Sequence, residues 1–278
     1  ATAAGGFTTL LAAAQAADPA VVATLTGPGP ITLFAPTDAA FNALLTELGL
    51  TANQLLANQA LLTTVLTYHV VPNRVLKANI PVGKAIASAQ GGIFKVDNNA
   101  SNQLQVFDGR NRASNITSTD ILATNGVIHV IDKVLLPADK NIVQTAQALP
   151  DFSILVEAVV AADLATTLSG TGPFTVFAPT NTAFGNALTE LGVTKDALFA
   201  DQALLTKILT YHVVPGRVLK AEIPFGTPGV TVQGETITID NTATITDQRG
   251  RTSKIVITDV LTSNGVIHAI DKVILPRP

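Results

Sequence analysis

The chain carries the same long stretches twice. Residues 119–137, TDILATNGVIHVIDKVLLP, return as residues 258–276, TDVLTSNGVIHAIDKVILP, with 14 of the 19 positions identical. Residues 66–78, LTYHVVPNRVLKA, return as residues 209–221, LTYHVVPGRVLKA. The offset is 139 residues for the first pair and 143 for the second, so the second copy has lost four residues in a variable loop. A period near 140 residues is too long for a solenoid repeat and indicates a duplicated domain.

The repeat divides the 278 residues into two units of ordinary domain size. We expect one domain at residues 1–137 and a second at residues 138–278. The second copy opens with apolar residues at helical spacing, and Thr2 of the first copy corresponds to Thr145. The chain is therefore expected to start inside the first helix of copy one.

Composition excludes several classes of protein. With 47% hydrophobic and 13% charged residues, the chain is not disordered. Residues 48–73 lack charge, but the amides in this run argue against a bilayer helix and favour amphipathic helices. A net charge of −3 without any basic block argues against nucleic acid as a partner. Because cysteine is absent, the chain has neither disulfides nor thiolate sites. It starts without Met, as a processed chain does, so a secretory signal would not be visible.

Local patterns place helices early and strands late in each copy. Thr37 follows the apolar run ITLFAP in N-cap position, the apolar residues from Phe41 to Leu48 form one helical face, and Gly49 ends the helix. Later runs such as GIFKVDN and LQVFDG alternate like strands between turn residues. Asn125-Gly126, between two apolar runs, predicts a β-hairpin with a type I′ turn. Helices followed by strands predict an α+β fold.

Three motifs occur in the same order in both copies, and in the first they read TLFAPTDAAF, YHVVP and NGVIHVIDKVLLP. Each copy therefore resembles the fasciclin (fasciclin I type) domain. The resemblance implies a seven-stranded β-wedge or sandwich packed with α-helices. It also implies a secreted or surface-anchored protein that adheres to cells, matrix proteins or surface polysaccharides. The Ala- and Thr-rich, cysteine-free composition fits a bacterial member best.

The same resemblance implies partner-binding residues. An Asp-Ile pair before the Asn-Gly turn is similar to the integrin-interacting dipeptide of animal members, and it falls on Asp120 and Ile121. The second copy departs from it, because Asp259 is followed by Val260. The Tyr-His motif of the family falls on the paired positions Tyr68, His69, Tyr211 and His212.

The other chemically active residues favour architecture over catalysis. The histidines lie at two positions per copy, without the spacing of a metal site, and we expect them to be hydrogen-bonded structural residues. Asp132 and Asp271 follow strands, where Asp usually caps turns. We expect Asp108-Gly109-Arg110 to form a hairpin turn, and GPGP at residues 27–30 to form a turn before a strand. No nucleophile motif is present, so we expect no enzyme, cofactor or metal.

Two functions remain open from the sequence. The first is adhesion through tandem fasciclin domains. The second is transport of an apolar molecule such as a carotenoid, which some fasciclin-like proteins bind, in an aliphatic groove near the Tyr-His segment. Asn99 and Asn115 match the glycosylation acceptor pattern, which matters only in a host with a glycosylating secretory pathway.

Overall fold

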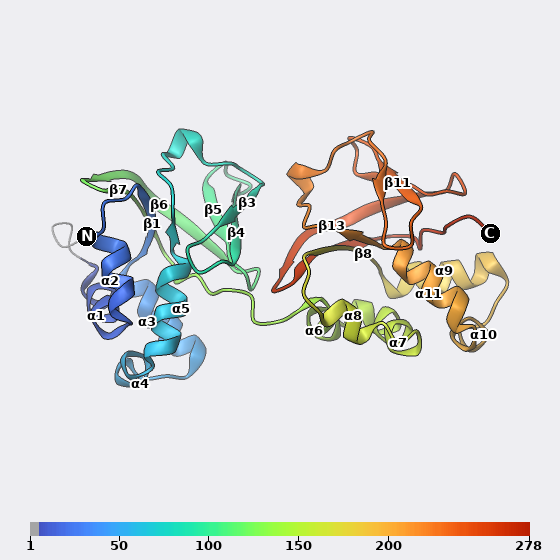
Figure 1. The fold of residues 1–278 in the computed structure, drawn as a ribbon, viewed down its shortest axis with the longest axis horizontal. Helices are drawn as coiled ribbons and strands as arrows, with labels where there is room; N and C mark the ends of the chain where they lie inside the picture. The colour runs from blue at the N-terminus through green and yellow to red at the C-terminus, as the bar shows by residue number, and fades with distance from the viewer. Residues whose placement is uncertain (1–5) are drawn as a thin grey trace. The chain divides into compact units, whose positions relative to one another are not determined.

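The computed structural model describes residues 6–278, and the chain divides into a first unit, Ala1–Ala138, and a second unit, Asp139–Pro278 (Figure 1). The prediction for Thr2 lies outside the described residues. The helices of the first unit are α1 (Thr8–Ala16), α2 (Pro19–Thr26), α3 (Asp38–Leu48), α4 (Ala52–Ala57), α5 (Gln59–Tyr68) and the short 3₁₀ turn η1 (Lys77–Asn79). Its strands are β1 (Ile31–Pro36), β2 (Val70–Val71), β3 (Ala85–Ala87), β4 (Ile93–Asn98), β5 (Leu104–Phe107), β6 (Ala113–Ala123) and β7 (Gly126–Ile131).

The second unit repeats this plan. Its helices are α6 (Ile142–Gln147), η2 (Pro150–Phe152), α7 (Ser153–Ala161), α8 (Ala165–Ser169), α9 (Asn181–Leu191), α10 (Lys195–Ala200), α11 (Gln202–Tyr211) and η3 (Lys220–Glu222). Its strands are β8 (Phe174–Pro179), β9 (Val213–Pro215), β10 (Gly229–Val230), β11 (Thr236–Ile239), β12 (Thr244–Thr246), β13 (Thr252–Thr262) and β14 (Gly265–Ile270). No helix within residues 6–278 combines the length and the apolar character that crossing a membrane requires.

Each unit contains one mixed, nearly closed sheet. Over the described residues the strand order is β2-β1-β7-β6-β5-β4-β3 in the first unit and β10-β11-β12-β13-β14-β8-β9 in the second. Among the strands that the structure describes, the β1–β7 and β8–β14 pairs alone are parallel. Within each unit the two edges of the same sheet come close together. In the first unit the Ala89 N–H, just after β3, donates to Val70 O of β2 at 2.7 Å. In the second unit the Val232 N–H, just after β10, donates to Val213 O of β9 at 2.7 Å. The α+β prediction with seven-stranded sheets is confirmed.

Two apolar clusters fill each unit. One lies between the helices and the sheet, as with Leu10, Phe41 and Leu62 in the first unit. The other fills the interior of the wedge, where Phe34 and Phe94 pack. Figure 1 shows the main helices of each unit gathered on one side of its strands. Each unit therefore has one core between its helices and its sheet and a second core inside the wedge of strands.

The predicted helix after ITLFAP is confirmed as α3. The Thr37 hydroxyl oxygen accepts the Ala40 N–H at 3.2 Å, and Phe41 and Leu44 are buried. Gly49 ends the helix with a φ of 65°, the left-handed conformation that a residue without Cβ adopts readily. The cap signals and the apolar stripe were sufficient here because both act within one helix.

The hairpin of β6 and β7 is confirmed, but the predicted type I′ turn at Asn125-Gly126 is wrong. Ala123 pairs with Gly126, so the turn residues are Thr124 and Asn125, and φ is positive at neither Asn125 nor Gly126. The Asn125 Nδ2 donates to the carbonyl oxygens of Leu25, in the last turn of α2, and of Gly27, which follows that helix. A Cβ on residue 126 would lie 2.0 Å from the Ile31 carbonyl oxygen. The Asn-Gly pair therefore contacts the end of α2 and strand β1, both distant in the sequence, and local sequence reasoning does not detect such contacts.

Candidate functional site

The Tyr-His segment lies at the end of α5, inside the first unit. Tyr68 and His69 are both 0% exposed. The Tyr68 hydroxyl donates to Ile93 O, and its ring meets the Phe94 ring edge-on at 5.8 Å. In the second unit the Tyr211 hydroxyl donates to Thr236 O at 2.9 Å, and burial raises the pKa of Tyr211 to about 12. The phenols thus tie the helices to β4 and β11 from within.

The adjacent histidines bridge the helix and the last segment of each unit. His69 Nε2 accepts the Leu135 N–H at 2.9 Å, so its proton is on Nδ1, which donates to Val65 O at 2.7 Å. His212 makes the same pair of bonds, to Ile274 N–H and Ile208 O. Burial lowers the pKa of each ring to about 4. Both rings are therefore neutral near pH 7, and their two nitrogens are used by the backbone.

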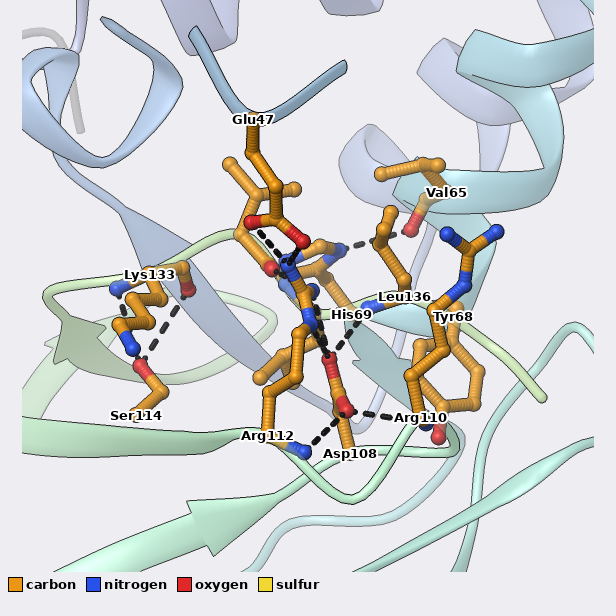
Figure 2. A network of polar contacts seen from close by, with 12 residues as sticks. Glu47, Val65, Tyr68, His69, Asp108, Arg110, Arg112, Ser114, Lys133 and Leu136 are labelled. Carbon is orange, nitrogen blue, oxygen red and sulfur yellow. Dashed lines mark hydrogen bonds and ion pairs between the residues drawn. The ribbon is translucent and has the colours of Figure 1, made fainter. Parts of the chain in front are cut away.

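A buried carboxylate organises the loop between β5 and β6 (Figure 2). Asp108 accepts the backbone N–H groups of Arg110 and Arg112, both at 3.0 Å, and that of Leu136 at 3.0 Å. The Arg112 guanidinium lies 2.6 Å from Asp108 and 2.7 Å from Glu47 of α3. One Asp-Arg-Glu network thus joins a helix, a turn and the last segment of the unit.

Sequence reasoning read this loop only as a turn, which is correct, and missed the network. In the second unit Asp247 accepts the Leu275 N–H at 2.9 Å, and Arg251 lies 2.7 Å from Glu190. The recurrence of Asp, Arg and Glu at the repeat offsets was the available signal. The charged groups of the network bind one another and the backbone, so the network has a structural role.

Asp120 lies at a β-bulge of β6, where the register to β7 shifts between Ser118 and Ile121. Its φ is 59°, a left-handed conformation that Asp and Asn tolerate best among residues with a Cβ. Its N–H donates to His129 Nδ1 at 3.3 Å, and its Oδ1 accepts the Lys77 N–H at 2.8 Å. The bulge and the start of η1 both depend on this residue.

The side chains around this bulge differ in exposure. Asp120 is exposed, Ile121 is half-buried against the helix-covered cluster, and Leu122 is 65% exposed. The equivalent Asp259 keeps the left-handed φ of 61° and accepts the Lys220 N–H at 2.7 Å, but it is only 7% exposed. The predicted site residues thus separate into buried Tyr-His pairs and one exposed carboxylate, in different hydrogen-bond networks.

A polar hollow of about 520 Å³ lies beside the bulge. Lys77, Thr119, Asn115 and Asp132 are among the residues that line it. Asp132 has a structural role but does not cap the turn after β7 as predicted: its Oδ1 accepts the Asn115 N–H at 2.7 Å, which joins the end of β7 to β6. Of the two glycosylation candidates, Asn115 is exposed and Asn99 is half-buried.

The histidines have the structural role that the sequence predicted. His129 Nε2 donates to Val75 O at 2.8 Å and His268 Nε2 to Val218 O at 2.9 Å, while the Nδ1 atoms accept from Asp120 and Asp259. Each ring therefore holds two backbone groups. Across residues 6–278, no three His, Asp or Glu side chains converge as metal ligands.

Comparisons with known proteins agree with these features. The family model described as Fasciclin domain matches residues 5–137 and 150–276. Transforming growth factor-beta-induced protein ig-h3 of Sus scrofa is 32% identical over 252 residues, which are 90% of this chain and 35% of that protein. Protein sll1483 of Synechocystis sp. is 42% identical over 150 residues, 53% of this chain and 79% of that protein.

A solved FAS1 domain pair from the insect cell adhesion molecule fasciclin I aligns with a TM-score of 0.49 and 18% identity, over 98% of this chain and 97% of that one. This chain spans about a third of the length of the ig-h3 relatives. The family match covers both units and nearly all of the described residues. The chain belongs to the fasciclin domain family.

Proposed function

We propose that this protein is a secreted or cell-surface adhesion and scaffold protein that attaches to cells, matrix proteins or surface polysaccharides. Its membership of the fasciclin domain family supports the proposal, because adhesion is the role that the family resemblance implies. The net charge of −3 is compatible with such partners and gives no attraction to nucleic acid.

The observation that supports a particular attachment surface is the exposed bulge at Asp120. Its carboxylate and the 65% exposed Leu122 lie two residues apart on β6, beside the polar hollow that Thr119 helps to line. A charge, an apolar side chain and a concave polar surface together provide the contacts that protein interfaces combine. We therefore propose that the first unit makes the attachment through residues 119–122.

The Tyr-His pairs have a different part in this proposal. Tyr68 and His69 are fully buried, so a partner that leaves the fold intact does not touch them. They hold α5 against β4 and Leu135. We propose that they and their counterparts Tyr211 and His212 keep the binding surface in shape without contacting the partner.

Capture of surface proteins and polysaccharides on the immobilised protein tests this proposal. Asp120→Asn is the informative change, because Asn tolerates the left-handed φ and its Oδ1 still accepts the Lys77 N–H, so only the charge is lost. Asp259→Asn is the matched control in the second unit. We expect the Asp120→Asn, Leu122→Ser double variant to lose most of the captured material and the control to retain it. Equal capture by both folded variants would contradict the proposed surface.

A second candidate function, transport of an apolar molecule, is favoured by an apolar cavity of about 100 Å³ in the second unit. The cavity includes Ile237, next to the residue whose carbonyl accepts the Tyr211 hydroxyl. It holds part of a long polyene at most, because a cavity of about 150 Å³ accommodates a single benzene ring. Uptake of pigment during reconstitution, followed by visible absorbance, distinguishes a carotenoid carrier from an adhesion protein.

The proposal assigns no reaction to the chain. Each histidine, the side chain best suited to act as a base near pH 7, uses both ring nitrogens to hold backbone groups. A hydrolase screen that found an activity lost in folded His69 and His212 variants would overturn this part of the proposal.

A further inference from the structure

The two units fill the interior of their wedges differently. In the first unit Phe94 is 0% exposed, and its ring meets the Phe34 ring edge-on at 5.1 Å. Ile86, on the neighbouring strand β3, pairs with Phe94 and is 6% exposed. Together these two side chains fill the space between β1 and the β3–β4 pair.

Both positions carry smaller residues in the second unit. At the repeat offset of 143 residues, Ile237 stands in place of Phe94 and Gly229 in place of Ile86. The two exchanges remove about seven side-chain carbon atoms from one site, and large-to-small changes in a core leave a cavity where the surroundings do not collapse. Ile239 and Ile245 replace valines nearby and return about two of these atoms.

The cavity of about 100 Å³ lies at this place. Gly229 and Ile237 line it from β10 and β11, opposite Phe177 of β8. The remaining lining residues are mainly aliphatic and include Val214, Val218 and Ile223. The location and the composition of the cavity thus follow from the exchanges at positions 229 and 237.

The hydroxyl of Thr175, the buried threonine in the cavity wall, already has its hydrogen-bond partners within the protein. Thr175 donates through Oγ1 to Gly216 O at 2.7 Å, and the same oxygen accepts the Val218 N–H at 3.0 Å. A polar ligand would therefore lose hydrogen bonds to water without replacing them there. Apolar cavities of this size remain dry and accept apolar guests.

The surface next to the cavity is also apolar. Phe225 is 41% exposed and Val230 is 58% exposed, and each adjoins a cavity-lining residue in the sequence. The first unit has Val82 and Ala87 at these positions, which are smaller. Exposed apolar side chains at the rim of a concave apolar site are typical of a ligand entrance.

We propose that the second unit, and not the first, binds a compact apolar group of about five to seven carbon atoms between β8 and the β10–β11 pair. A six-membered hydrocarbon ring or the branched end of an isoprenoid chain has this size. Phe225 and Val230 would contact the part of the ligand that extends out of the cavity. The inference is independent of the adhesion function, which concerns the first unit.

Titration of the full chain with toluene, followed through isoleucine methyl resonances, tests the site. We expect saturable shifts at Ile223, Ile237 and Ile239 of the second unit and none at Ile80 and Ile86 of the first. Phenol, of nearly the same size, should bind more weakly because the buried Thr175 hydroxyl, already hydrogen-bonded as donor and acceptor, offers the phenol hydroxyl no partner. Absence of saturation up to the solubility limit of toluene would overturn the proposal.

The matched variants exchange the filling residues between units. Gly229→Ile with Ile237→Phe refills the cavity, and a Cβ at residue 229 meets no atom closer than Ile237 O at 3.9 Å. We expect this variant to bind toluene at least about tenfold more weakly and to unfold at a higher temperature. Should the refilled variant not fold, Ile86→Gly with Phe94→Ile should create toluene-dependent shifts at Ile80 of the first unit. Unchanged toluene affinity in the folded refilled variant, or no new shifts in the reciprocal one, would contradict the assignment.

Discussion

Replacing Asp108 by Asn should destabilise the first unit strongly, although the two side chains have the same shape. The Asp108 carboxylate is 1% exposed and accepts from three backbone N–H groups and from the Arg112 guanidinium. An Asn amide group turns a donor towards at least two of these donors and removes the charge that faces Arg112. Asn is therefore unable to satisfy the network in either orientation.

The size of the effect follows from these contacts. Removing one partner of a buried ion pair destabilises a protein by about 3–5 kcal/mol. The lower end applies here, because Arg112 keeps its contact with the half-exposed Glu47. A loss of about 3 kcal/mol, with a urea m-value of about 2 kcal/mol per molar, lowers the unfolding midpoint by about 1.5 M.

Tyrosine fluorescence makes the assay specific for one unit. The chain has no tryptophan, and its two tyrosines lie one in each unit, so in a Tyr211→Phe background Tyr68 reports on the first unit alone. Asp247→Asn is the control, which should leave the Tyr68 transition in place. A midpoint shift below about 0.5 M for Asp108→Asn would refute the reasoning, because it would mean less than about 1 kcal/mol for the whole network.

Three further predictions follow from the fold. As the pH falls from 6.5 to 4, the free energy of unfolding of the first unit should decrease by up to about 3 kcal/mol, because His69 binds a proton near pH 6.5 in the unfolded chain but only near pH 4 in the fold. His69→Gln should flatten this part of the pH profile of stability measured in urea. Gly126→Ala should destabilise the first unit by more than about 2 kcal/mol in urea unfolding, since its Cβ would meet the Ile31 carbonyl; a near-neutral effect would contradict the close approach. Asp120→Ala should lower the free energy of unfolding by about 1 kcal/mol more than Asp120→Asn does, and so lower the thermal midpoint further, because the bulge requires positive φ; equal midpoints would argue against this role.

Features encoded within one element could be predicted from the sequence. The N-cap at Thr37, the apolar stripe of α3 and the glycine at residue 49 act within a few turns of helix, and the structure has all three. The β6–β7 hairpin was predicted because its strands adjoin in sequence. The α+β class followed from the order of such local signals.

Features that depend on distant contacts could not be predicted. Asn125-Gly126 has the local signature of a type I′ turn, yet the Asn125 side chain is hydrogen-bonded to the end of α2, about 100 residues earlier in the chain. Arg112 and Glu47 are 65 residues apart, so no spacing rule connects them. An aromatic-His pair reads the same whether exposed or buried, and only the fold reveals that Tyr68 and His69 are enclosed.

The proposed adhesion function requires that the exposed carboxylate of Asp120 contacts the partner and that the buried carboxylate of Asp259 does not. The most direct measurement is the number of cells that remain attached under flow to surfaces coated equally with Asp120→Asn or Asp259→Asn protein. Both changes remove one charge at equivalent bulges and keep an acceptor for the η1 or η3 N–H group. We predict that attachment falls markedly for Asp120→Asn and stays at the unaltered level for Asp259→Asn. Equal attachment on both coatings, with both proteins folded, would contradict the account.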